Sequence, residues 1–465
     1  MITNIPQQII EIYSKLHDKG SETYFVGGCV RNILMGMPVK DWDLTTIAIP
    51  NEIKNVFPNS FYDNAFGTVG VPLGDHTNKE DVYEKNYVEI TTFRVEGNYK
   101  DWRHPQVVQW GKSIEDDLSR RDFTINAIAL RPKTNNPTTI SDFEIIDPFN
   151  GQKDLENKIV RAVGDPKQRF KEDALRLMRG VRIATEYGFN VEENTWKEII
   201  NDVKLIKEVS GERIQTELLK ILATNHPYEG IMLLKNSGLL QYTLPELLKG
   251  VGVSQVRPDR HHTSDVFTHN VLSLKFCLSN DPIVRFATLL HDVGKPQVAQ
   301  KDEQGLVIFH NHEIVGSRIA RQICDRLHFS RKDRDKIVNL IRWHMFTVDE
   351  KITDAAVRRF IRRVGVESVK DIMDLRIGDR LGGGTQTAES WRLKLFKKRI
   401  EEQLKPAPFS INDLAIDGSD VMKELSIKPG RKVGQILKRL FEEVDEDLSK
   451  NNKEYLLRRI REIKL

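Results

Sequence analysis

The stretch that decides the fold of the N-terminal region is GGCVRNILMGMPVKDWDLTT, residues 27–46. Gly27 and Gly28 follow the apolar segment YFV and precede a helix-like segment, and Asp41 and Asp43 then lead into the strand-like LTTIAI. A glycine turn before a helix lets backbone N–H groups and the helix dipole approach phosphate groups closely. Alternate residues of a strand point to the same side, so the spacing predicts that the two carboxylates project together.

Paired carboxylates on one face can hold Mg²⁺ ions, which bridge phosphate oxygens and lower the pKa of an attacking hydroxyl. Arg31, in the intervening helix, is placed to meet a phosphate. A third carboxylate is expected on a neighbouring strand, and Glu89 in YVEITTFR is the candidate. An exposed strand residue without a metal is the alternative interpretation of Glu89.

The periodicity of the chain changes once along its length. Up to about residue 147, strand-like segments such as TYFVGG, NYVEITTFRV and TINAIAL alternate with helices. From about residue 152 onward, apolar residues recur at the i, i+3, i+4 spacing of helices, interrupted by Gly and Pro turns. The sequence therefore predicts an α+β head followed by an all-α body, and 465 residues suffice for about three domains.

Composition narrows the setting in which the protein works. The N-terminus lacks the pattern of a signal peptide, and no apolar run approaches the roughly 20 residues that cross a bilayer, so we expect a cytoplasmic protein without a membrane partner. Three separated cysteines fit a reducing compartment. The net charge of +4 does not by itself indicate nucleic acid. Residues 351–405, however, hold 14 Lys or Arg against 8 Asp or Glu, which is either a solvated face or an RNA contact.

Residues 27–46 resemble the signature of the polymerase-beta-like nucleotidyltransferases, specifically the class II tRNA nucleotidyltransferase (CCA-adding enzyme) and bacterial poly(A) polymerase family. The segment DDLSRRDFTINAIAL resembles that family's ribose-recognising motif, which spans Asp117, Arg121, Asp122 and Asn126. The resemblance implies that these residues choose ribonucleotides through the 2′-hydroxyl, which both donates and accepts hydrogen bonds.

The segment EDALRLMR resembles the family's nucleotide-selection motif. We expect residues 165–189 to form one amphipathic helix in which Asp173, Arg176 and Arg179 interrupt the apolar positions, with Asp173 and Arg176 on one face. A carboxylate can accept a hydrogen bond from an exocyclic amine, and a guanidinium can donate one to a ring nitrogen. The Watson–Crick edges of cytosine and adenine both present this amine and this nitrogen. Uracil and guanine present a carbonyl instead of the amine and should be rejected. An intrahelical salt bridge is the alternative interpretation.

Two further segments extend the resemblance. Residues 96–111 combine Gly, Pro and charges without periodicity and resemble the family's flexible loop, in which Asp101 and Arg103 are the expected nucleotide contacts. The segment SGERIQTELLKIL, with Glu212, Arg213 and Glu217, resembles its helix-supporting element, and a structural role is the preferred interpretation.

Eight of the twelve histidines fall between residues 261 and 344. His291 and Asp292 are adjacent at the end of an apolar helix, where neighbouring imidazole and carboxylate groups suit a divalent metal. Residues from successive helices could complete the site: His269, His312, His344 and Asp379. This order resembles the HD superfamily of metal-dependent phosphohydrolases, and it implies a divalent transition metal.

Together these resemblances predict four parts: a nucleotidyltransferase head at 1–147, a helical neck or RNA-binding region at 148–255, an HD domain at 256–385 and a helical tail at 386–465. The implied reaction adds CCA to tRNA 3′ ends from CTP and ATP with Mg²⁺ and releases pyrophosphate. Three alternatives stay open: a poly(A) polymerase, an enzyme that adds only CC or only A, and an HD phosphohydrolase whose head binds RNA without catalysis.

Overall fold

The computed structural model describes residues 5–62, 67–73, 86–95, 109–134, 137, 139–255, 264–346, 352–404 and 410–463. The chain divides into two compact units, residues 1–245 and 246–465, and each is described by itself. The expected loop contacts Asp101 and Arg103 lie outside the described residues. Among the described helices, none combines the length and the apolar character that a membrane-spanning segment needs.

A seven-stranded sheet forms the N-terminal part of the first unit, with the strand order β3-β4-β5-β2-β1-β8-β9. Strands β2 and β5 run parallel, and the other neighbours run antiparallel. The strands are β1 (Thr23–Val26), β2 (Asp43–Thr46), β3 (Phe61–Tyr62), β4 (Thr68–Pro72), β5 (Tyr87–Thr92), β8 (Ala129–Pro132) and β9 (Phe143–Ile146). A separate pair joins β6 (Arg94–Val95) to β7 (Gln109–Trp110).

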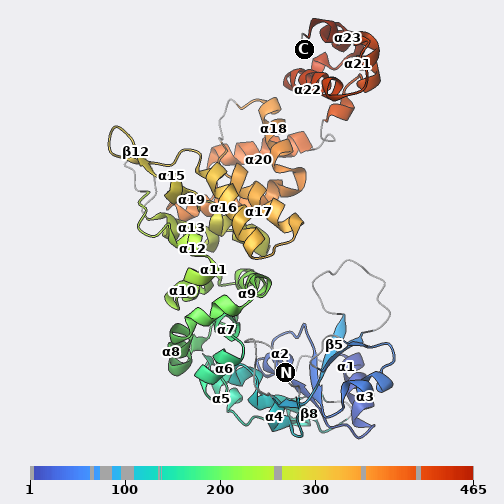
Figure 1. The fold of residues 1–465 in the computed structure, drawn as a ribbon, viewed down its shortest axis with the longest axis vertical. Helices are drawn as coiled ribbons and strands as arrows, with labels where there is room; N and C mark the ends of the chain where they lie inside the picture. The colour runs from blue at the N-terminus through green and yellow to red at the C-terminus, as the bar shows by residue number, and fades with distance from the viewer. Residues whose placement is uncertain are drawn as a thin grey trace. The chain divides into compact units, whose positions relative to one another are not determined.

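Strand alternation determines which side chains of this sheet enter its core. Along β5 burial alternates, so that Val88 and Ile90 are fully buried while Glu89 is only partly buried. The buried face packs on three helices near the N-terminus (Figure 1), α1 (Gln7–His17), α2 (Gly28–Leu34) and α3 (Pro50–Val56). On the opposite face, Tyr24, Val26 and Ala129 pack in a second apolar cluster with α4 (Ile114–Ser119). Elsewhere in the sheet, Asp43 of β2 pairs in register with Glu89 of β5.

Helices make up most of the remainder of the first unit. They are α4 (Ile114–Ser119), α5 (Gly151–Glu156), α6 (Pro166–Glu172), α7 (Arg176–Tyr187), α8 (Glu193–Asn201), α9 (Gly211–Ala223), α10 (Pro227–Asn236), α11 (Leu240–Thr243) and the start of α12 (Pro245–Leu248). A buried cluster that includes Phe123, Ile125 and Ile183 joins the end of the sheet region to α7. The helical segment around α7 is therefore held firmly against the sheet region.

The described residues of the second unit form helices and one short strand pair (Figure 1). Its helices are α13 (Val266–Lys275), α14 (Pro282–Leu290), α15 (Lys295–Val298), α16 (His312–Arg326), α17 (Arg331–Trp343), α18 (Asp354–Val364), α19 (Val369–Gly382), α20 (Trp391–Leu404), α21 (Gly418–Leu425), α22 (Arg431–Glu446) and α23 (Lys453–Glu462). The last three pack around a core of their own that contains Val421, Leu440 and Leu456.

These observations confirm the expected α+β head and helical body, except that the body also contains two short strand pairs. The region after residue 147 is not entirely helical, because β10 (Ile159–Val160) pairs with β11 (Asn190–Val191) and β12 (Gln300–Lys301) pairs with β13 (Val307–Ile308). These two-residue strands carry no apolar alternation that would reveal them in the sequence. The expected four-part division stays a prediction.

The arginine run of α18 has a structural role that the sequence left open. Arg358 Nε lies 2.8 Å from Asp445 Oδ1, and Arg362 Nη2 lies 2.5 Å from Asp445 Oδ2. Asp445 belongs to α22 and is buried. Arg358 and Arg362 therefore fasten α18 to α22.

Candidate functional site

A cavity of about 840 Å³ opens at the sheet of the first unit. Twelve of the site residues expected from the sequence line it: Gly27, Gly28, Arg31, Asp41, Asp43, Glu89, Arg121, Asp122, Asn126, Asp173, Arg176 and Arg179. The cavity also contains six basic residues outside the expected nucleotide-binding set: Lys40, Arg94, Arg120, Arg182, Arg213 and Lys220. Of these, Arg213 was expected to have a structural role. In total the lining has ten Lys or Arg and five Asp or Glu, so it suits an anionic occupant.

The carboxylates sit where the strand pairing places them. Asp43 is the first residue of β2, and its register partner on the parallel strand β5 is Glu89. Asp41 lies in a bend just before β2 and is exposed, so the expectation that both aspartates belong to one strand is wrong for Asp41. Asp41 nevertheless lines the same cavity as Asp43 and Glu89.

Position 27 requires glycine for two reasons, its backbone conformation and the closeness of neighbouring side chains. Its φ of +74° lies in the region that side chains avoid. A Cβ atom at this position would lie 3.0 Å from Nη1 of Arg121 and 3.4 Å from Oδ2 of Asp43. The glycine therefore lets a guanidinium and a carboxylate approach the start of α2 from two other elements.

Asp117 is the one expected head residue of the described set that does not line the cavity. It is completely buried in α4, and its carboxylate accepts hydrogen bonds from Arg120 Nε at 3.0 Å and Arg121 Nη2 at 3.1 Å. Burial acts to raise the pKa of Asp117, but the two guanidinium groups hold it below its usual value. Asp117 thus orients two cavity arginines from behind.

Asp122 anchors a second network on the cavity wall. Its carboxylate accepts from Arg179 Nη2 at 2.6 Å, from the backbone N–H of Phe123 at 2.8 Å and from Asn126 Nδ2 at 3.2 Å. Asn126 Oδ1 in turn accepts from Arg31 Nη1 at 2.6 Å. Burial opposes ionisation of Asp122, yet Arg179 and Arg176 hold its pKa far below the usual range. The carboxylate is therefore ionised at neutral pH and fixed in place.

Asp173 and Arg176 are brought to the same cavity by a different geometry from the one expected. Residues 165–189 form two helices, because Asp173 is extended (φ −143°, ψ 105°) and interrupts them. Its Oδ1 accepts from the N–H of Leu175 at 3.0 Å, a local bond that competes with continuation of the helix. The prediction of one helical face shared by the two residues is therefore wrong.

The observed partners of these two side chains also differ from the predicted pairing. Asp173 Oδ2 accepts from Arg213 Nη2 of α9 at 2.7 Å. Arg176 donates to Glu172 Oε2 at 2.6 Å and to the carbonyl oxygens of Arg169 and Arg120. Arg213 belongs to the segment ERIQTE, so this segment was the signal in the sequence that could have revealed the contact with Asp173. Glu217 of the same segment is buried and accepts a hydrogen bond from Arg182 at 2.7 Å.

The six residues expected at the HD site converge in the second unit, and all are buried. They come from α13 (His269), the end of α14 (His291 and Asp292), the start of α16 (His312), the end of α17 (His344) and α19 (Asp379). Asp292 lies at the centre of this histidine cluster. Its Oδ2 is 3.3 Å from Nε2 of both His269 and His291, and its Oδ1 is 3.2 Å from Nε2 of His312.

Backbone carbonyls orient the rings of this histidine cluster. Nδ1 of His291, His312 and His344 lies 2.7–2.8 Å from the carbonyl oxygen three residues earlier, so it can donate its proton there. Each Nε2 is then directed inward, toward the carboxylate of Asp292, which is the ring orientation that metal-binding imidazoles adopt. Two groups have ligand atoms close enough to share an ion: His269, His291 and Asp379, and His291, Asp292 and His344.

A cavity of about 330 Å³ leads to the histidine cluster. Lys295 and Arg376 line it, and they contact Asp292 Oδ2 at 2.5 Å and Asp379 Oδ2 at 2.7 Å. Burial disfavours the protonated form of His291, but Asp292 and Asp379 raise its pKa to about 10. The sequence argument missed both basic residues, although Lys295 lies only three positions after Asp292.

The fold and the cavity define a nucleotidyltransferase head joined to a helical body with an HD domain. Three family models match in that order: "Poly A polymerase head domain" over residues 23–161, "Probable RNA and SrmB- binding site of polymerase A" over residues 188–250 and "HD domain" over residues 269–395. The A-adding tRNA nucleotidyltransferase of Deinococcus radiodurans is 32% identical over 430 residues, which is 90% of each chain. The chain therefore belongs to the tRNA nucleotidyltransferase and poly(A) polymerase family and is a nucleotidyltransferase.

Further relatives have related names. The CCA-adding enzyme of Ligilactobacillus salivarius (strain UCC118) is 29% identical over 98% of this chain and 97% of that one. The CCA-adding enzyme of Geobacillus thermodenitrificans is 41% identical over 242 residues, and here the chain spans about half of the relative, 55% of its length. Among solved structures, the Bacillus stearothermophilus CCA-adding enzyme in complex with CTP superposes with a TM-score of 0.69 at 25% identity, covering 98% of this chain and 96% of that one.

Proposed function

We propose that this protein adds CCA to the 3′ end of tRNA, using CTP and ATP as nucleotide donors. One observation carries the proposal: Asp41, Asp43 and Glu89 share a cavity with ten basic side chains. The names of full-length relatives support the choice of tRNA as acceptor. In the reaction the terminal 3′-hydroxyl oxygen bonds to the α-phosphorus, the α–β phosphoanhydride bond breaks, and pyrophosphate leaves while the hydroxyl proton passes to solvent.

The donor set of the head fits Mg²⁺, because Asp41, Asp43 and Glu89 offer only carboxylate oxygen, which this hard cation prefers. When bound there, Mg²⁺ lowers the pKa of the attacking hydroxyl and neutralises phosphate charge. The protein's own side chains bind the triphosphate through the basic lining. Arg121 is positioned by Asp117, and Arg179 by Asp122, so neither needs to be ordered when the nucleotide arrives.

We assign base selection to Asp173 with Arg176. The Asp173 carboxylate already accepts from Arg213 and from a backbone N–H, and a carboxylate has about four acceptor sites, so it can also accept from an exocyclic amine. Arg176 must exchange one of its present acceptors for a ring nitrogen. The Asp122 and Asn126 network is assigned to the ribose 2′-hydroxyl. The site of action we propose is the cytoplasm.

The decisive experiment supplies purified protein with tRNA lacking CCA, first with each labelled nucleoside triphosphate alone and then with CTP and ATP together. Incorporation of C alone, followed by A only when CTP is present, is the expected result. A long A tract would indicate a poly(A) polymerase. Addition of A only to tRNA ending in CC would place the protein with its Deinococcus radiodurans relative, which is named as A-adding.

A second activity is supported by the histidine cluster. Four imidazoles and two carboxylates fit a divalent transition metal, and the adjoining cavity contains Lys295 and Arg376, which suit a phosphate group. We propose a phosphohydrolase activity at this site, on cyclic or terminal phosphates of RNA ends. The test is release of phosphate, or opening of a 2′,3′-cyclic end, by the metal-loaded protein. An inactive head with an active histidine cluster would instead favour a phosphohydrolase with an RNA-binding head.

A further inference from the structure

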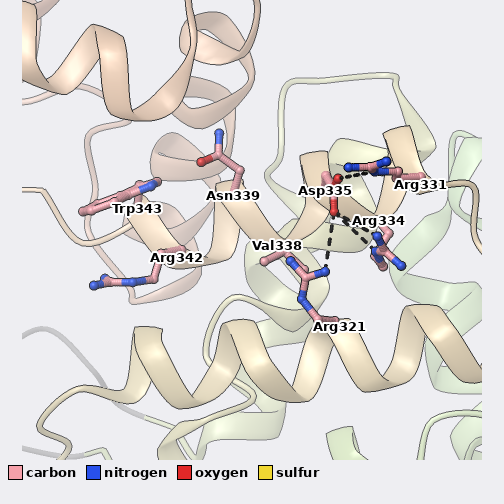
Figure 2. A pocket seen from close by; sticks show the side chains of 8 residues that line it. All are labelled: Arg321, Arg331, Arg334, Asp335, Val338, Asn339, Arg342 and Trp343. Atoms are coloured by element: carbon pink, nitrogen blue, oxygen red, sulfur yellow. Dashed lines mark hydrogen bonds and ion pairs between the residues drawn. The ribbon is translucent and has the colours of Figure 1, made fainter. Parts of the chain in front are cut away.

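The helices α16 and α17 enclose a second basic cavity, of about 510 Å³, which belongs neither to the head nor to the histidine cluster (Figure 2). We call it the arginine groove. Its lining comprises one residue of α16, Arg321, and seven of α17: Arg331, Arg334, Asp335, Val338, Asn339, Arg342 and Trp343. Four guanidinium groups and a single carboxylate therefore face this space.

The ion pairs in the arginine groove have long N–O distances and share one carboxylate, so they leave several guanidinium N–H groups without a close acceptor in the part of the chain that the structure describes. Asp335 is shared by three arginines: Arg321 Nη1 lies 3.6 Å away, Arg331 Nε 3.8 Å and Arg334 Nε 3.3 Å (Figure 2). Ordinary hydrogen bonds of this kind measure about 2.7–3.2 Å. Arg334 has a closer partner in Asp325 at 3.0 Å. The N–H groups of Arg321 and Arg331 are consequently held near the groove without strong acceptors among the described residues.

At the other end of the arginine groove, an aromatic ring positions two further cations. The guanidinium of Arg342 lies 4.5 Å from the ring centroid of Trp343, and that of Arg363 in α18 lies 5.2 Å from it. Among the described residues, the one carboxylate in contact with Arg342 is that of Glu313, at the long distance of 3.5 Å. Stacking on an aromatic ring fixes the plane of a guanidinium and leaves its N–H edge available to an anion.

The spacing of these cations identifies the shape of the ligand. Arg331, Arg334 and Arg342 recur on one face of α17 and extend over eleven residues, which is roughly 16 Å of helix. A single phosphate or a nucleotide needs donors that converge on one point, whereas a row of separated cations matches a chain of phosphates. We propose that the arginine groove binds the sugar–phosphate backbone of the tRNA. The identity of this RNA rests on the proposed function, and the groove itself rests on the contacts above.

The test compares the full-length protein with a triple variant, Arg321→Gln, Arg331→Gln and Arg342→Gln. These side chains are 47%, 89% and 33% exposed, so their neutralisation should leave the fold intact. The probe is tRNA lacking CCA, and the readout is its Kd at several salt concentrations. We expect the Kd at about 0.1 M salt to rise ten-fold or more, and the slope of log K against log salt to weaken by about two to three.

Two controls make the result interpretable. The triple variant Lys301→Gln, Lys453→Gln and Arg461→Gln removes the same charge from exposed positions outside the groove and outside residues 351–405, and it should bind tRNA nearly as the unmodified protein does. The variant Arg321→Lys, Arg331→Lys and Arg342→Lys keeps the charge and should keep the salt slope. An unchanged Kd and slope in the glutamine variant, or an equal loss in the distant control, would overturn the proposal. Because binding is measured without nucleotide, failure of CCA addition would be a separate result.

Discussion

The head cavity and the histidine cluster both gather carboxylates, but they do so in opposite ways. In the head, Asp41 and Asp43 are two positions apart, Glu89 joins them across one strand pairing, and Asp41 is exposed. In the second unit, the six residues come from five helices, extend from His269 to Asp379 and are all buried. The head cavity measures about 840 Å³ and the cavity at the cluster about 330 Å³.

This difference distinguishes a site that binds and releases substrate, the head cavity, from a site that retains a metal ion, the histidine cluster. A few oxygen ligands in an open, basic cavity leave coordination positions for substrate, as catalytic Mg²⁺ sites do. A closed set of imidazoles with oriented rings satisfies most of a metal's coordination from protein alone. We therefore expect the two sites to respond independently to mutation, and the predictions below test that independence.

The largest effect is expected in the head. Asp43→Ala removes the carboxylate paired with Glu89, so the rate of nucleotide addition should fall about a thousandfold or more, which corresponds to roughly 4 kcal/mol. Asp41→Ala should behave similarly. Single-turnover incorporation of labelled CMP measures the rate, while tRNA affinity and metal content at the histidine cluster should stay constant. Retention of most of the rate by either variant would remove that aspartate from the mechanism.

The reciprocal experiment breaks the histidine cluster. His291→Ala removes a buried ligand that belongs to both candidate metal groups, so affinity for a divalent transition metal should fall at least about a hundredfold. Metal analysis after dialysis measures the loss, and CCA addition should continue at its original rate. If addition fails equally in a folded variant, the two sites are coupled and the comparison above does not hold.

A matched control uses another histidine of the same unit. His328 is exposed, lies outside the cluster and has a φ of +57°, so Asn is a replacement that its backbone tolerates. His328→Asn should keep both the metal and the addition activity. Equal metal loss in this variant would show that the assay reports general damage to the unit.

A smaller effect should follow from Asp173→Ala, which tests base reading. Loss of one bidentate recognition is worth on the order of 1–3 kcal/mol, so selectivity for CTP over UTP should fall by roughly one to two orders of magnitude. Competition between the two nucleotides in one reaction measures it. The control Asp165→Ala removes the cap of α6 outside the cavity and should leave selectivity unchanged. An unaltered CTP to UTP ratio in Asp173→Ala would refute base reading by this carboxylate.

The sequence predicted features that depend on local patterns better than it predicted contacts between distant residues. The α+β head follows from the change of hydrophobic periodicity, and the six HD residues, expected from the density and order of the histidines, converge in the structure. Glu89 was expected on a neighbouring strand, but its register with Asp43 was not predicted. The interruption at Asp173 was missed, because a side chain that bonds the N–H two residues on overrides helical periodicity. Arg213 and Asp445 were also missed as partners, since their contacts join residues 40 and more than 80 positions apart. No spacing in the sequence encodes such pairs.

The smallest effect is expected at Asp445, which tests whether the second unit can be weakened without touching either site. Asp445→Asn leaves Arg358 and Arg362 facing a neutral group, and because Arg362 is 30% exposed we expect a loss of about 1–2 kcal/mol, less than for a fully buried pair. Burial alone would raise the pKa of Asp445, but the two arginines lower it. This stabilisation is therefore fully present above the unfolded pKa of about 3.9 and decreases as pH falls from there through the lower pKa of the folded state. Urea unfolding at pH 7 and pH 3 measures both effects.

The neighbouring variant Glu446→Gln, whose pair with Arg359 is 3.8 Å long and exposed, should change stability by less than about 0.5 kcal/mol. An equal loss in both variants, or a loss for Asp445→Asn that is as large at pH 3 as at pH 7, would contradict the role of this carboxylate in fastening α18 to α22.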